Sequence, residues 1–154
     1  MEETALADLI YTYGEERRSR AVARAIVAMR RETPFETTKQ LADLVARVVH
    51  MPRDAIHPAT RTFQALRIAV NDEMGALTEG ITAAWRMLSE GGRIAIITFH
   101  SVEDREVKQL LAGFAKDGGT LVYKKPLTPT PQELADNPRA RSAKLRVIEK
   151  KETL

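Results

Sequence analysis

The sequence HSVEDR at residues 100–105 contains the side chains best suited to chemistry in this chain of 154 residues. His100 is followed by Ser101, Glu103 and Asp104, so an imidazole and a hydroxyl lie near two carboxylates. Such a group can transfer protons. Its spacing does not match metal-ligand motifs such as HExxH, which argues against a metal site. Ser101 followed by acidic residues is also typical of a helix N-cap, and the two roles are compatible.

This polar stretch lies between two predicted elements. The apolar, largely β-branched run RIAIITF at 93–99 precedes it, and a predicted helix at 102–116 follows it. The run predicts a central strand buried on both faces. A helix, a Gly-Gly pair, a strand, a polar loop and a helix form the order expected of a doubly wound α/β protein. Ligands of such proteins bind beyond the carboxyl ends of strands, which places residues 100–105, including Arg105, at the expected crevice.

The end of the chain has the pattern of a hairpin, with TLVYKK at 120–125 and AKLRVIEKK at 143–151. The proline-rich segment between them predicts a loop packed over the site. Three strands are too few for a complete doubly wound sheet, so we expect an incomplete one. Residues 119–154 contain 8 basic and 4 acidic side chains. Such an excess attracts phosphates, although a solvated basic face is the commoner explanation.

The first third of the chain is predicted to be helical. Apolar residues recur at helical spacing over residues 6–10, 21–29 and 41–48. This pattern predicts three helices, of which the second has an arginine-rich opposite face. Thr37 or Thr38 is suited to cap the third helix. Pro52 and Pro58 bracket a predicted linker.

We therefore predict two domains, a small all-helical unit over residues 1–56 and an α/β unit over residues 57–154. The second unit begins with HPATRTFQALRIAVND, predicted to be helical from Thr60, and continues with a helix at about 76–89. The following Gly91-Gly92 ends that helix and permits a tight turn.

Composition excludes several classes of protein. No apolar run approaches the roughly 20 residues that a membrane span needs, and the acidic N-terminus has no signal-type apolar core. The chain has no cysteine, which excludes disulfides, thiolate metal sites and a cysteine nucleophile. No G-x-G-x-x-G or P-loop pattern is present, so spacing alone predicts no cofactor site. These features predict a cytosolic, hence cytoplasmic, globular protein.

Five blocks, in order from about Ala5 to Lys151, together resemble one family. They are YGEERRSRAVARAIV, HPATRTFQALRIAVNDE, GGRIAIITFHSVEDREVK, KKP and NPRARSAKLRV. The chain resembles the bacterial small-subunit (16S) ribosomal RNA cytosine-N4 methyltransferases, the methyltransferase H or MraW-like family. This resemblance implies a class I, Rossmann-like fold with a helical insertion. It also implies S-adenosylmethionine-dependent methylation of a cytosine in the ribosomal decoding centre.

The same resemblance implies that the chain is the C-terminal portion of such an enzyme. Residues 1–56 would be most of the insertion that helps to recognise RNA, and RIAIITF would be the fifth strand of the sheet. The family's glycine-rich cofactor loop, acidic ribose ligand and fourth-strand loop all precede this segment, so no residue here is expected to bind the principal part of the cofactor. We expect a fragment, a truncated product or one part of a split enzyme.

The candidate site residues form three groups. His100, Ser101 and Asp104 are the catalytic candidates, and Arg105 completes their wall of the substrate pocket. The second group would form the other wall of the pocket or support it, and comprises Arg61, Gln64, Arg67 and Asn71. The structural alternative is that these residues tie their helix to neighbouring loops. The third group would either bind RNA phosphates directly or order the loop beside them. Its members are Lys124, Lys125, Asn137, Arg139, Arg141, Ser142, Lys144 and Arg146.

Two further expectations concern partners. Small-subunit ribosomal RNA is the expected substrate, and a non-catalytic RNA-binding module or truncated remnant is the alternative for the whole chain. The open edge of the predicted strand at 93–99 and the sheet faces without covering helices expose backbone and apolar groups. These features predict self-association, or a missing N-terminal half as the natural neighbour.

Overall fold

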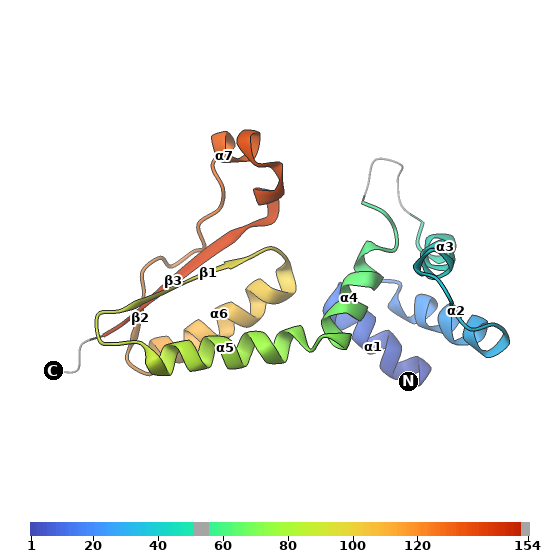
Figure 1. Ribbon diagram of the computed structural model, residues 1–154, viewed down its shortest axis with the longest axis horizontal. Helices are drawn as coiled ribbons and strands as arrows, with labels where there is room; N and C mark the ends of the chain where they lie inside the picture. Colours follow the sequence, from blue (N-terminus) through green and yellow to red (C-terminus); the bar gives the residue numbers. More distant parts are fainter. Residues whose placement is uncertain (51–55, 152–154) are drawn as a thin grey trace. The chain divides into compact units, whose positions relative to one another are not determined.

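The computed structural model describes residues 1–50 and 56–151 (Figure 1). The chain forms two compact units, Met1–Glu73 and Met74–Leu154. Within these described ranges, no helix is long and apolar enough to cross a membrane. Pro52, the predicted start of the linker, lies outside the described residues.

The first unit consists of four helices in its described residues, namely α1 (Glu3–Gly14), α2 (Ser19–Glu32), α3 (Thr38–Val48) and α4 (Thr60–Val70). Its core contains the apolar stripes predicted from the sequence, with Ile10 and Val22 fully buried and Val45 1% exposed. Thr37 caps α3 in a capping box in which its side chain accepts from the Gln40 backbone N–H and the Gln40 side chain accepts from the Thr37 backbone N–H. The prediction of a threonine cap is therefore confirmed at Thr37.

Helix α4 belongs to the first compact unit, which extends to Glu73, whereas the predicted helical unit covers residues 1–56. The helix packs against α1, and Ala65 of α4 is completely buried in the helical core. Close approach is possible because α1 ends at Gly14, where a Cβ atom would clash with the carbonyl oxygen of Arg61. A glycine that looks like a simple helix end in the sequence therefore also allows two backbones to meet.

The second unit contains a three-stranded sheet and its helices, namely α5 (Glu73–Met87), β1 (Arg93–Thr98), α6 (Ser101–Lys116), β2 (Gly119–Leu121), α7 (Pro131–Asp136), the 3₁₀ helix η1 (Pro138–Ser142) and β3 (Lys144–Lys150). The sheet order is β1-β3-β2, and both pairings are antiparallel. Ile94 lies opposite Ile148, and Ile96 lies opposite Arg146. The described strands thus form a small antiparallel sheet and not a doubly wound parallel one.

Helices α5 and α6 cover one face of this sheet (Figure 1). Trp85 of α5 stacks on Phe114 of α6, with ring centroids 4.9 Å apart and an interplanar angle of 5°. Both helices pack around Ile148 of β3, which is fully buried. Burial of these side chains supplies the main driving force for folding of the unit.

Strand β1 is an edge strand, which corrects the prediction that it is buried on both faces. Its residues alternate, with Ile94 and Ile96 packed on the helices and Ile97 59% exposed. Phe99, just after the strand, is 56% exposed. The β-branched composition suits an extended backbone whether or not both faces are covered, so composition alone could not distinguish the two cases.

The C-terminal hairpin is confirmed for β2 and β3, but its connection differs from the prediction. Strand β2 ends at Leu121, and Leu127 makes an isolated bridge with Leu145. The segment predicted as an irregular loop contains α7 and η1, because Thr130 caps α7 and prolines occupy early positions of both helices. No further strand occurs in the described part of this unit.

The replacement Gly14→Ala is expected to lower the free energy of unfolding of the helical unit by about 1–3 kcal/mol, because the new methyl group overlaps the Arg61 backbone. Urea unfolding followed by circular dichroism measures this effect. Gly113→Ala is the matched control, since a Cβ atom there meets nothing within 4 Å and lies inside α6. The control should be neutral or more stable by about 1 kcal/mol. Equal effects at both glycines would contradict the packing argument.

Candidate functional site

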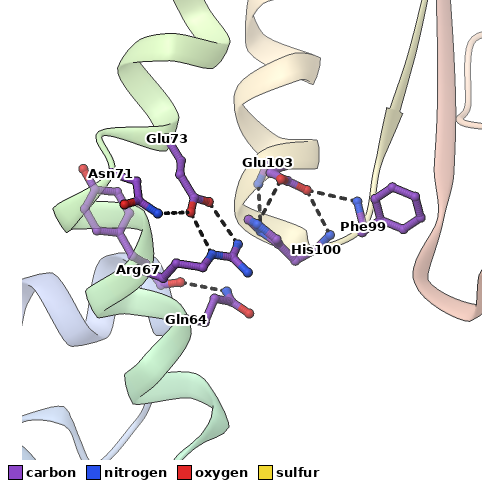
Figure 2. Close-up of polar contacts among 8 residues, drawn as sticks. Gln64, Arg67, Asn71, Glu73, Phe99, His100 and Glu103 are labelled. Atoms are coloured by element: carbon purple, nitrogen blue, oxygen red, sulfur yellow. Dashed lines mark hydrogen bonds and ion pairs between the residues drawn. The ribbon is translucent and has the colours of Figure 1, made fainter. Parts of the chain in front are cut away.

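The turn after β1 is ordered by a reciprocal cap between His100 and Glu103 (Figure 2). The Glu103 backbone N–H donates to His100 Nδ1 at 3.3 Å. In return, Glu103 Oε2 accepts from the backbone N–H groups of Phe99 at 3.0 Å and His100 at 3.4 Å. The N-cap is therefore His100, and Ser101, predicted as the cap, is the first residue of α6.

This cap determines the tautomer of His100. Because Nδ1 accepts a hydrogen bond, the proton of the neutral ring is on Nε2. The Nε2 atom is buried and lies 3.1 Å from Glu103 Oε1, but it makes no hydrogen bond in the described part of the chain. A buried polar atom without a well-formed hydrogen bond is uncommon in proteins. The side chain as a whole is 16% exposed, although Nε2 itself is buried.

One turn further along α6, Asp104 is held by two cations from β3. Arg146 Nε donates to Asp104 Oδ1 at 2.8 Å, and Arg146 Nη2 donates to Oδ2 at 3.1 Å. Lys144 Nζ donates to the same Oδ2 at 3.1 Å. Asp104 is only 8% exposed. The Arg146 hydrogen bonds hold the pKa of Asp104 below its usual value, Lys144 lowers it further, and burial opposes both.

The cluster of Asp104, Lys144 and Arg146 changes the roles predicted for its members. Asp104 carries a negative charge at neutral pH and is fully engaged, so it is poorly suited to proton transfer. Lys144 and Arg146 are directed at Asp104 and are not free to bind phosphate in this structure. Since Lys144 lies opposite Thr98 in the register, the cluster ties the first turn of α6 to the carboxyl end of β1.

The second predicted group lies on α4 and at its end, in the first unit. Arg61 Nη1 donates to the Glu15 carbonyl oxygen at 3.1 Å, and Gln64 Nε2 donates to the Tyr13 carbonyl oxygen at 2.9 Å. Arg61 and Gln64 therefore tie α4 to the end of α1. This observation favours the structural alternative for these two residues.

Arg67 and Asn71 instead converge on one carboxylate (Figure 2). Arg67 makes a bidentate ion pair with Glu73, in which Nε donates to Oε1 at 2.7 Å and Nη2 donates to Oε2 at 2.9 Å. Asn71 Nδ2 donates to Glu73 Oε1 at 3.3 Å. Arg67 remains 55% exposed, so its guanidinium is positioned by Glu73 and still faces solvent.

A groove of about 760 Å³ runs along α4 in the first unit, and its lining was only partly predicted. Gln64 and Arg67 line it as candidate site residues. His57, Phe63 and Lys39 line it as well and were not predicted. The sequence does contain a signal for Phe63, because it lies one helical turn before Arg67 and beside Gln64. Lys39 comes from α3, so only the tertiary packing reveals it.

The remaining predicted residues lie at the surface of the second unit. Ser101 and Arg105 are exposed on the first turns of α6. The residues predicted to bind phosphate follow β2 or surround η1. The exposed members of the predicted phosphate-binding set are Lys124, Lys125, Asn137, Arg139, Arg141 and Ser142. Among the residues that the structure describes, no group of three or more His, Cys, Asp or Glu side chains could hold a metal ion.

The second unit thus has an antiparallel sheet, a helical layer on one face and an ordered polar turn at the carboxyl end of β1. A helical layer packed on one face of a sheet is one of the common layered architectures of proteins that combine helices and strands. The sequence comparison identifies the family within this class. The model of the MraW methylase family matches residues 1–151, and the chain belongs to that family.

Relatives with curated names give the same result. A ribosomal RNA small subunit methyltransferase H of Nitrobacter winogradskyi is 53% identical over 163 residues, which cover 96% of this chain and 49% of the relative. A protein of the same name from Deinococcus radiodurans is 55% identical over 150 residues, which cover 97% of this chain and 47% of the relative. The chain spans about half the length of the curated relatives it matches.

The replacement Asp104→Asn is expected to lower the free energy of unfolding at neutral pH by about 1–3 kcal/mol, because it leaves Arg146 with a weaker partner. Since the pKa of Asp104 is lowered in the folded state, its contribution is complete above the ordinary aspartate pKa of about 4. The contribution disappears as the pH falls through the folded-state pKa. The variant should therefore lose part of the acid dependence of stability, measured by urea unfolding at a series of pH values.

The matched control is Glu149→Gln, which removes the more exposed ion pair with Arg93. That change should cost at most about 1 kcal/mol. A control as destabilised as the Asp104 variant, with the same pH dependence, would show that the buried cluster contributes no more to the free energy of unfolding than an exposed ion pair.

Proposed function

We propose that this chain is the substrate-side part of an S-adenosylmethionine-dependent enzyme that methylates the N4 amine of a cytosine in the decoding centre of small-subunit ribosomal RNA. The match of the MraW methylase family over residues 1–151 carries this proposal. The names of the relatives supply the substrate class, small-subunit ribosomal RNA. A cytoplasmic location follows from that substrate.

The glycine turns of the second unit do not fit the role of an S-adenosylmethionine cradle. Gly91 N–H donates to the Lys150 carbonyl oxygen at 2.8 Å, and Gly92 N–H donates to the Ser89 carbonyl oxygen at 3.0 Å. The carbonyl oxygen of Gly118 accepts from Lys151 N–H at 2.8 Å. These backbone groups are used within the protein and are not presented to a ligand. The proposed role of this chain is therefore on the substrate side.

The proposed chemistry of His100 follows from its buried Nε2–H. The exocyclic amine of cytosine is a poor nucleophile because its lone pair is delocalised into the ring, so orientation must supply much of the rate enhancement. A base that reacts must also leave its stack and be held in a pocket. We propose that substrate binding exposes the buried Nε2–H, which makes no hydrogen bond in the described residues, and that it donates to an acceptor on the cytosine edge. His100 then orients the base, and the Asp104 cluster keeps the turn in place.

We further propose that the helical part of the chain, residues 1–56 of the predicted insertion, contributes to RNA recognition. In the second unit, the exposed cations after β2 and around η1 remain suited to phosphate contact. Arg105 and Ser101 would border the base on α6. In the first unit, Arg67 is directed by Glu73 beside the apolar groove of α4 and is proposed to contact substrate there.

A chimera tests the proposed function. Residues 1–151 of this chain replace the matching region of the Nitrobacter winogradskyi relative, and methyl transfer to small-subunit ribosomal RNA is measured with radiolabelled S-adenosylmethionine. Mass spectrometry of the product identifies the modified atom. We expect N4-methylcytidine at a single decoding-centre position. A folded chimera that binds S-adenosylmethionine but methylates no RNA would contradict the proposal, and RNA binding without transfer would favour a non-catalytic module.

His100 variants of the same chimera separate capping from substrate orientation. Asparagine is a good N-cap, so His100→Asn keeps the helix start but removes the Nε2–H donor. Its stability should match that of the unmodified chimera, whereas kcat/KM should fall about tenfold or more. His100→Ala should lose the same activity and also about 1 kcal/mol of stability. Full activity of the asparagine variant would restrict His100 to a structural role.

The open edge of β1 supports a proposal about the partner of this chain. Strand β1 pairs with β3 on one side, and in the described residues no strand pairs with its other side. Ile97 is 59% exposed on the face that α5 and α6 do not cover. We propose that the isolated chain associates with itself through this edge, and that the predicted missing N-terminal half is the alternative neighbour.

Light scattering at tens of micromolar should give a mass above that of one chain. Ile97→Lys places a charge on the exposed face and should reduce this association. Met87→Lys is the matched control, because Met87 is 86% exposed on α5. A wild-type chain that is monomeric and unfolds cooperatively would contradict the proposal.

A further inference from the structure

An arginine-rich surface lies in the first unit, and the function proposed above assigns no contact to its individual residues. Residues 17–31 contain six arginines and no aspartate or glutamate. In the first unit, the turn between α1 and α2 and the start of α2 carry Arg17, Arg18 and Arg20, all of which are exposed. The surface faces solvent because the opposite, apolar side of α2 is buried in the helical core.

These arginines border a concavity of about 530 Å³. Tyr11 of α1 is 62% exposed and lines one side of it, and Arg17, Arg18 and Arg20 line it together with Asp8. The concavity therefore combines an accessible aromatic ring with three guanidinium groups. Its residues come from two helices and the turn between them, so the arrangement depends on the helical packing.

The turn that presents Arg17 and Arg18 is held by the protein itself. Glu15 has a positive φ of 52°, and its N–H donates to the Tyr11 carbonyl oxygen at 2.9 Å. Glu16 is 4% exposed, and its Oε1 accepts from the Arg18 backbone N–H at 2.8 Å. The two guanidinium groups thus project from an ordered backbone, which lowers the entropic cost of binding a ligand.

The electrostatics leave this surface available to an anion. The guanidinium groups of Arg17 and Arg18 make no hydrogen bond or ion pair with any described residue. Arg20 contacts Asp8 at 3.4 Å, with side chains that are 70% and 62% exposed. Such an exposed pair contributes little stability, so a phosphate can replace Asp8 as the partner of Arg20.

We propose that Tyr11, Arg17, Arg18 and Arg20 form a binding site for a nucleotide of single-stranded RNA. The base stacks on the Tyr11 ring, and the guanidinium groups bind the adjoining phosphates. This inference rests on the proposed function, and it identifies a second RNA contact on the helical unit. RNA fits better than an acidic peptide because the site pairs cations with an exposed aromatic ring, and guanidinium forks match phosphate oxygens.

Fluorescence anisotropy of the full chain with a labelled single-stranded RNA of about a dozen nucleotides tests the site. The double variant Arg17→Ala/Arg18→Ala should bind more weakly, and the slope of log affinity against log salt should fall by roughly 1.4 over about 50–200 mM salt. Tyr11→Ala should weaken binding about tenfold with little change in slope, and Tyr11→Phe should restore it.

The matched control is Arg31→Ala/Arg47→Ala, which removes the same charge from exposed positions outside the concavity. It should leave the affinity within about twofold of the wild type. Equal losses in both double variants, or no loss with Tyr11→Ala, would overturn the site, as would failure of the chain to bind RNA. Tighter binding to polyglutamate than to RNA would assign the surface to an acidic partner. Methyl transfer by the chimera, measured separately, shows whether the proposed function stands when this site fails.

Discussion

The buried ion cluster of Asp104 with Arg146 and Lys144 is the interaction on which the position of the polar turn in the second unit depends. It joins the first turn of α6 to β3, and β3 is the central strand that pairs with both β1 and β2. Removing charges from water is costly, and only close, multiple hydrogen bonds repay that cost. The bidentate hydrogen bonds from Arg146 to Asp104 meet this requirement. The cluster therefore constrains the polar turn that begins with His100.

The placement of this cluster explains how a sheet of three strands can present an ordered site. The apolar contacts of Trp85, Phe114 and Ile148 hold α5 and α6 on one face but do not direct any polar group. Direction comes from the reciprocal cap of His100 and Glu103 at the start of α6. Burial thus supplies stability, whereas hydrogen bonds select the orientation of the imidazole. The proposed substrate-orienting role of the turn requires both.

The first unit distributes its polar residues differently. Arg61 and Gln64 bond to backbone carbonyl groups at the end of α1, so two side chains that look like ligand contacts hold helices together. Arg17 and Arg18 project from a turn that is already stabilised by Glu16. A cation that is bonded within the protein contributes to the fold, and one that faces solvent is available for a partner. This distinction separates the arginines more clearly than their number does.

Much of this protein follows from the sequence alone, because helical periodicity, caps and turn residues act over short distances. Those local signals predicted the helices of the first unit, the Thr37 cap, the strand at 93–99 and the hairpin that pairs β2 with β3. The family resemblance was likewise available from contiguous blocks and is confirmed by the match over residues 1–151. Only the tertiary structure decided that β1 is an edge strand and that Arg146 bonds to Asp104, a residue 42 positions away. Pairing between distant charges depends on which elements pack together, and the composition and spacing of a short segment do not show which distant element it contacts.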